Sequence, residues 1–97
     1  MKSKTSTTTI KNIGAIFPLY KSKPIRLQIE QRGKQSFICR HPESNSGFEG
    51  DTRAEAVDST LQLMVSSFEM LKKMPESTLG PAMIEKRDAL LNLIERA

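Results

Sequence analysis

The stretch from Gly47 to Pro75 predicts one long helix with a defined start, an apolar face and a defined end. Thr52 is a favourable N-cap residue, and Glu55 three positions later completes a capping-box pattern. Pro75 disfavours helical geometry at the residue before it and so marks the end. A helix over about 52–74 would be roughly 34 Å long. A chain of this size has a radius of gyration of about 13 Å, so this helix should cross the whole domain.

The apolar face of this helix is a single stripe with spacings of 4, 3, 4 and 3 residues. One interpretation is that the stripe covers a sheet, and the other is that part of it forms a helix–helix seam in a dimer. The heptad spacing lasts for about two repeats, fewer than the three or four typical of a coiled coil, which favours the first interpretation. The stripe consists of Val57, Leu61, Met64, Phe68 and Leu71.

Two segments of the first half of the chain predict an antiparallel hairpin. In residues 24–31, Ile25, Leu27 and Ile29 alternate with polar residues, which is typical of a strand with one buried face. Arg32 and Gly33 supply a turn, and residues 35–40 form the second strand. Because two strands alone are marginally stable in water, a third strand is expected, either at 47–49 or from a partner chain.

A second helix is expected at about 81–96, because proline is favoured at the first position of a helix and Pro81 stands there. The short link after the first helix favours an antiparallel pair of helices. The predicted fold class is therefore α+β, with a small antiparallel sheet packed on the long helix. Residues 10–97 are expected to form this single domain.

The segment before the hairpin has a weaker pattern. Residues 1–9 are polar and basic, which is typical of a disordered tail. Residues 10–20 are apolar but irregular, and we expect a short helical turn or an edge strand there. Ile16, Phe17, Leu19 and Tyr20 are expected to cover one end of the core.

The composition limits the class of protein. No segment has the ~18 consecutive apolar residues that could span a membrane. The single cysteine, Cys39, excludes an internal disulfide framework and favours a reducing cytoplasmic location. The size and composition are also common among small proteins of phages and other mobile elements.

The charge is distributed unevenly along the chain. Residues 1–50 contain nine Lys/Arg and three Glu, a balance of +6, whereas residues 51–97 contain six Lys/Arg and eight Asp/Glu, a balance of −2. Such asymmetry is expected when a basic half faces an anionic partner, either nucleic acid or an acidic protein surface.

Six basic residues lie on or beside the predicted hairpin, and a basic ribbon of this kind can follow a phosphate backbone. Tyr20 is a candidate for stacking on a base. No recognition-helix or RNA-binding aromatic motif predicts sequence-specific binding. The six candidate binding residues are Lys21, Lys23, Arg26, Arg32, Lys34 and Arg40.

Few residues suggest catalysis or metal binding. Cys39 and His41 are two positions apart and can share one face of a strand. A structural zinc site needs four ligands, and the chain has no other Cys or His. A Cys–His nucleophile pair lacks an orienting group and an oxyanion site. We therefore expect no metal, no cofactor and no enzyme activity, and we expect Cys39 to be a small core residue.

The order of a hairpin, a short third strand and a helix that opens with GDTRAEAV resembles the antitoxin-type HicB domain. The resemblance covers about residues 25–66 and depends on Gly50, Asp51, Glu55 and Ala56. It implies an order of elements, and we take no function from it.

The sequence thus predicts a small non-enzymatic protein whose basic hairpin binds an anionic surface, most favourably nucleic acid. The alternative is a protein–protein interaction module or a stoichiometric inhibitor, encoded by a phage or another mobile element, that acts on a host protein. Uncovered strand edges and the helix stripe also allow a homodimer.

Overall fold

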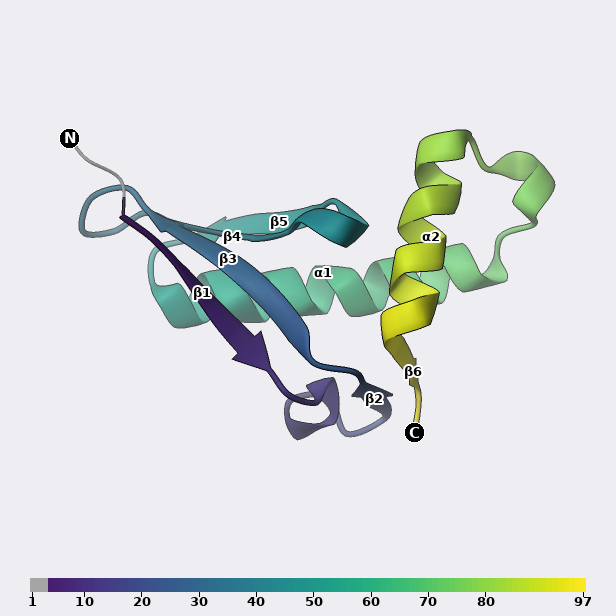
Figure 1. Ribbon diagram of the computed structural model, residues 1–97, viewed down its shortest axis with the longest axis horizontal. Coiled ribbons are helices and arrows are strands. Elements are labelled where there is room, and N and C mark those ends of the chain that lie inside the picture. The colour runs from purple at the N-terminus through teal and green to yellow at the C-terminus, as the bar shows by residue number, and fades with distance from the viewer. Residues whose placement is uncertain (1–3) are drawn as a thin grey trace.

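A computed structural model describes residues 4–97. The sheet at its centre has four antiparallel strands in the order β1-β3-β4-β5. Their bounds are Lys4–Ile10, Ile25–Gln31, Phe37–His41 and Ser46–Gly50. The long helix α1, Arg53–Lys73, lies against one face of this sheet (Figure 1). The α+β class is therefore confirmed.

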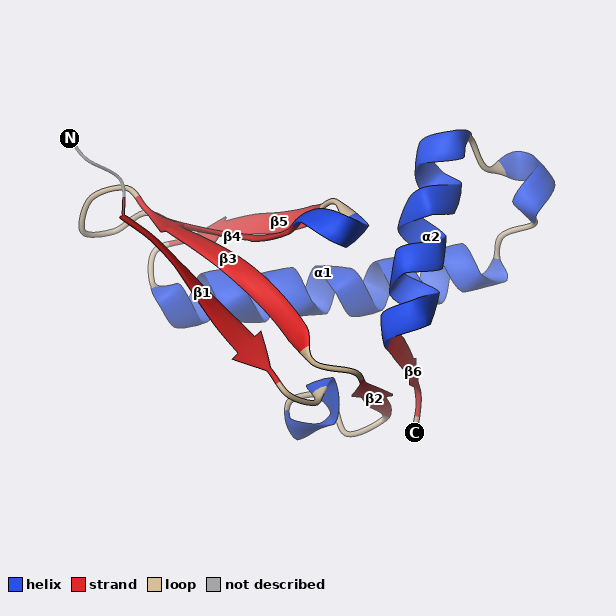
Figure 2. Ribbon diagram, viewed as in Figure 1, coloured by secondary structure: helices blue, strands red, loops and turns tan. Residues whose placement is uncertain are grey.

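A second, smaller sheet joins the two halves of the chain. Its strands are β2, Tyr20–Ser22, and β6, Ile94–Arg96, which pair antiparallel. The helix α2, Pro81–Leu93, follows α1 in the sequence and directly precedes β6. Three short 3-10 segments complete the structure (Figure 2): η1 at Ile13–Ala15, η2 at Pro42–Ser44 and η3 at Glu76–Thr78.

The predicted hairpin and third strand are confirmed. β3 pairs with β4 so that Ile29 faces Cys39, and β4 pairs with β5 so that Cys39 faces Phe48. Gly33 has a φ of 83° at the hairpin turn, a conformation that glycine adopts without steric cost.

Strand β1 lies where a structureless tail was expected over residues 1–9. Residues 4–10 pair with β3 in an unbroken register, with Ser6 opposite Ile29 and Ile10 opposite Ile25. The segment lacks an apolar alternation because both of its faces are largely exposed, yet its β-branched threonines favour extended backbone. Residues 1–3 of the expected tail lie outside the described part of the chain.

The core lies between the sheet and α1. Thr52 Oγ1 accepts a hydrogen bond from the Glu55 amide at 3.1 Å, which confirms the predicted cap. The interpretation of the helix stripe as core is also confirmed. Four of its members are at most 3% exposed, namely Leu61, Met64, Phe68 and Leu71, and Val57 is half-buried beside them.

The C-terminal helix is shorter than expected and runs in a different direction. It ends at Leu93, because Ile94 is extended (φ −118°, ψ 143°) and residues 94–96 pair with β2. The link from α1 contains η3, and α2 crosses α1 instead of lying antiparallel to it (Figure 1).

The end of the core beside η1 also differs from the expectation. Ile13 is fully buried there, and Phe17 and Tyr20 are partly buried against the core. Ile16 and Leu19 are 41% and 76% exposed, so these two residues do not cover the core. Among the described residues, no helix is both long and apolar enough to cross a membrane.

Candidate functional site

The face of the four-stranded sheet opposite α1 is polar and exposed. Paired residues on neighbouring strands point to the same side of a sheet. Since Ile25, Leu27 and Ile29 point toward the core, the residues between them point outward. We call this surface the outer face. It contains Thr5, Thr7 and Thr9 of β1, Arg26, Gln28 and Glu30 of β3, Ile38 and Arg40 of β4, and Glu49 of β5.

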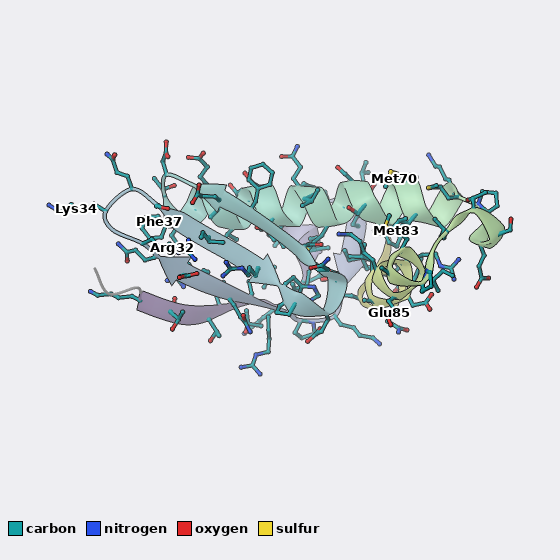
Figure 3. The ribbon with its side chains drawn as sticks, turned by 90° about the horizontal axis from the view of Figure 1, so that it is seen from above. Arg32, Lys34, Phe37, Met70, Met83 and Glu85 are labelled. Carbon is teal, nitrogen blue, oxygen red and sulfur yellow. The ribbon has the colours of Figure 1, made fainter. Side chains whose placement is uncertain are left out.

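Four of the six predicted basic residues belong to the outer face or to the turn beside it. Arg26 and Arg40 project from β3 and β4. Figure 3 shows Lys34 at the tip of the β3–β4 turn, with Arg32 and Phe37 nearby. The hairpin therefore brings these four cations to one side of the molecule.

Glu30 binds two of these cations. Its carboxylate accepts hydrogen bonds from Arg32 Nε at 2.9 Å and from Arg40 Nη1 at 3.1 Å. The hydrogen bond to Glu30 is the main cause that raises the pKa of Arg32, so this guanidinium stays charged. Glu30 thus holds Arg32 and Arg40 close together while it cancels one of their two positive charges.

Together with the β3–β4 turn, the outer face keeps a small positive balance of charge. Arg26, Arg32, Lys34 and Arg40 contribute four positive charges, and Glu30 and Glu49 contribute two negative charges, which leaves +2. Glu43, on the rim of the face, lowers the balance to +1.

Two adjoining hollows make the face concave near β1 and β3. One has a volume of ≈ 320 Å³ and is lined by Thr7, Arg26, Leu27, Gln28, Pro42 and Glu43. The other has a volume of ≈ 440 Å³ and is lined by Thr5, Ser6, Thr7 and Gln28. Because both include Thr7 and Gln28, they form one shallow groove across the two strands. Its hydroxyl, amide and guanidinium groups can all donate hydrogen bonds.

The other two predicted basic residues lie on a different surface. Lys21 and Lys23 line a pocket of ≈ 410 Å³ between β2, β6 and the segment before η1. Lys21 forms an exposed ion pair with Glu95 at 3.4 Å. The structure thus divides the six predicted basic residues into a group of four at the outer face and the adjoining turn, and a group of two beside the second sheet.

The Tyr20 side chain contacts other residues of the fold. Its ring meets the edge of Phe68, with centroids 6.1 Å apart and an interplanar angle of 87°. Its hydroxyl donates a hydrogen bond to Glu69 Oε1 at 3.1 Å. Desolvation and this carboxylate raise the pKa of Tyr20. The ring lies on the second sheet, apart from the outer face, so the two do not form one stacking surface.

Cys39 and His41 share the core face of β4, as the sequence suggested, and both are buried. Burial raises the pKa of the Cys39 thiol, so the reactive thiolate is disfavoured. Burial also lowers the pKa of His41, which favours the neutral ring. Among residues 4–97, no three His, Cys, Asp or Glu side chains are grouped as a metal site would require.

His41 belongs to a buried chain of polar side chains that was not predicted from the sequence. His41 Nδ1 is 2.7 Å from Ser44 Oγ, which is 2.9 Å from Ser46 Oγ. A histidine beside a serine hydroxyl is also found in nucleophilic enzymes. Ser44 is fully buried, and its hydroxyl links His41 to Ser46 across the η2 turn.

The fold and surface define a small α+β protein with one open, polar sheet face. Comparisons with protein-family models, with curated proteins and with solved structures gave no match.

Proposed function

We propose that this chain is a non-enzymatic binding protein whose outer face binds the phosphate backbone of a nucleic acid. The observation that carries the proposal is the placement of Arg26 and Arg40 on one exposed sheet face, with Arg32 and Lys34 in the adjoining turn. Arginine binds phosphate with a planar set of donors, and the hydroxyl and amide groups of the groove add further donors.

The chemistry of the face favours phosphate contacts over base recognition. Ile38 is its apolar member, and neither Tyr20 nor Phe37 points to this side. Proteins that read single-stranded bases usually stack them on exposed aromatic rings. We therefore expect binding that depends little on the base sequence of the nucleic acid and weakens as the salt concentration rises.

The test is fluorescence anisotropy with labelled single-stranded and double-stranded DNA and RNA over a series of salt concentrations. For four phosphate contacts, the slope of log K against log salt should be about −3 to −4. Replacing Arg26 and Arg40 together by glutamine should weaken binding and reduce the slope by about 2. Failure to bind any of these nucleic acids at low salt would contradict the proposal.

A matched control is available on α1. Replacing Lys72 and Lys73 by glutamine removes the same charge from exposed positions at the end of that helix. We expect this variant to bind much more tightly than the Arg26→Gln, Arg40→Gln variant. If both lose affinity equally, net charge determines the binding and the outer face does not.

One observation favours a second candidate, a protein partner. Met70 of α1 and Met83 of α2 are large apolar side chains that are 52% and 37% exposed, and Figure 3 shows both in the part of the molecule that contains the two helices. Flexible methionine side chains are common on surfaces that bind other proteins. Affinity capture from a nuclease-treated lysate tests this candidate. Capture of one protein by the native chain, but not by a Met70→Lys, Met83→Lys variant, would support it.

A further inference from the structure

Strand β1 leaves one side of the four-stranded sheet open. It pairs with β3 and stands at the end of the strand order, and no other described element lies along its outer side (Figures 1 and 2). Its seven residues span roughly 23 Å at 3.3 Å per residue. The backbone groups along that side are therefore available to another strand.

This edge lacks the features that usually prevent strands from pairing between molecules. Such features include charges, prolines, bulges and covering elements. From Thr5 to Ile10 the strand contains no charged residue and no proline. Its register with β3 is unbroken over all seven pairs, so it has no bulge. The opposite edge, β5, differs because it is shorter and lies against α1.

Helix α1 leaves the core side of β1 partly uncovered. The helix packs mainly against β4 and β5, and Arg53 Nη1 donates a hydrogen bond to Ser6 Oγ of β1 at 3.2 Å. Ser6 is exposed, and Thr8 and Ile10 are half-buried, although all three point to the core side of the sheet. A further strand can therefore continue the sheet without displacing α1.

We propose that the partner of this edge is a second copy of the same chain, with β1 pairing antiparallel to itself about Thr7. This register places Thr7 opposite Thr7, Thr5 opposite Thr9 and Ser6 opposite Thr8. Every one of these pairs joins two hydroxyl-bearing residues, and Thr–Thr and Thr–Ser pairs are favourable across strands. Lys4 falls opposite Ile10, so no like charges face each other, as a self-complementary edge requires.

The resulting dimer has a continuous eight-stranded sheet. The outer faces of the two copies join into one surface, because Thr5, Thr7 and Thr9 of each copy lie on that face. The groove at Thr5, Ser6, Thr7 and Gln28 then lies at the seam between the copies. This inference concerns assembly and holds whether or not the surface binds nucleic acid.

The contact is limited to one pair of strands, so it falls at the small end of specific interfaces, below about 1,200 Å². We therefore expect a monomer–dimer equilibrium that depends on protein concentration. Sedimentation velocity or light scattering over a wide concentration range should show the mass rising from one chain to two. A monomeric mass at every concentration would overturn the proposal.

Substitution of Thr7 tests which surface is used. Thr7→Lys places two positive charges opposite each other at the symmetry axis, so this variant should remain monomeric. Ser66→Lys, which adds the same charge to an exposed position of α1, should dimerise like the unchanged protein. A Thr7→Lys variant that still dimerises would reject this edge as the interface.

A cysteine at the same position tests the register and does not depend on Thr7→Lys folding correctly. Directly opposed strand residues have Cα atoms about 4.5–5.5 Å apart, within the range of a disulfide. With Cys39 replaced by alanine, Thr7→Cys should form a covalent dimer rapidly when an oxidant is added. A Ser66→Cys control should crosslink slowly. Equal rates for the two variants would contradict the proposed register.

Discussion

At the scale of single residues, Glu69 joins three elements that are far apart in the sequence. It accepts hydrogen bonds from Tyr20 Oη of β2 and, in a bidentate pair, from Arg96 of β6 at 3.0 and 2.9 Å. The hydrogen bond from Arg96 is the main cause that lowers the pKa of Glu69 to about 2. Glu69 is thus the side chain through which α1 holds the second sheet.

This lowered pKa predicts an acid-dependent loss of stability. In the unfolded chain the Glu69 carboxyl has a pKa near 4.5, so the stabilisation by its ionised form is complete above pH 4.5. The stabilisation is lost as the pH falls from 4.5 toward 2. Urea unfolding at several pH values should therefore show Glu69→Gln less stable than the native protein near pH 7, with the difference shrinking below pH 4.5. A difference independent of pH would contradict this role.

His41 should have an effect in a higher pH window. Because burial lowers its pKa below 6.5, the unfolded state binds a proton more readily than the folded state. Stability should therefore fall as the pH drops below 6.5. A His41→Gln variant should lose this part of the pH dependence, although it should be less stable at pH 7 because the contact with Ser44 changes. Thermal unfolding between pH 5 and 8 measures both effects.

Gly50 is required where β5 meets the start of α1. A Cβ atom at this position would lie 2.7 Å from the Ala56 amide nitrogen and 3.1 Å from Glu55 Cβ. We expect Gly50→Ala to destabilise the fold by about 1–3 kcal/mol, as overpacking in a core does. Gly80→Ala is the control, because a Cβ there meets nothing within 4 Å. Its effect should be within about 0.5 kcal/mol in chemical denaturation.

At the scale of elements, the start of α1 depends on its cap. Thr52 Oγ1 satisfies the Glu55 amide, which has no partner within the helix. Thr52→Ala should cost about 1 kcal/mol of stability, and Thr52→Ser should retain most of it. Urea unfolding of both variants distinguishes loss of the hydroxyl from a general intolerance of substitution at this position.

The elements that the sequence predicted correctly have local signals. Thr52 and Pro75 bound α1, and the alternation of Ile25, Leu27 and Ile29 identifies β3. β1 has no such signal, because an edge strand whose two faces are both largely exposed to solvent shows no apolar alternation. The β-branched threonines were the available clue.

The parts that the sequence did not predict depend on distant contacts. β6 follows directly from α2, and its extended backbone depends on pairing with β2, more than 70 residues earlier. The division of the basic residues has the same origin. Lys21 and Lys23 are close in sequence to Arg26, but Lys21 belongs to the second sheet and Lys23 follows its strand β2. Sequence spacing alone carries no information about that division.

At the scale of the whole molecule, the reactivity of the Cys39 thiol measures how often the protein unfolds. The thiol is fully buried, with a raised pKa, in the middle strands of the sheet. A thiol reagent should therefore leave the native protein unmodified at neutral pH and react completely in denaturant. The reaction of native protein should accelerate in Gly50→Ala by about tenfold for each ~1.4 kcal/mol of stability that the substitution removes. Rapid labelling of the stable native chain would show that the strand β4 opens locally.

The small second sheet has a consequence for how the protein is made. Strands β1, β3, β4 and β5 lie within the first 50 residues, so they leave the ribosome early and can assemble once α1 follows. β2 leaves at nearly the same time, but its partner, residues 94–96, is synthesised far later. Until then Tyr20 can reach Glu69 without the guanidinium of Arg96. The second sheet can therefore form only after residues 94–96 have been translated, long after the strand β2 with which they pair.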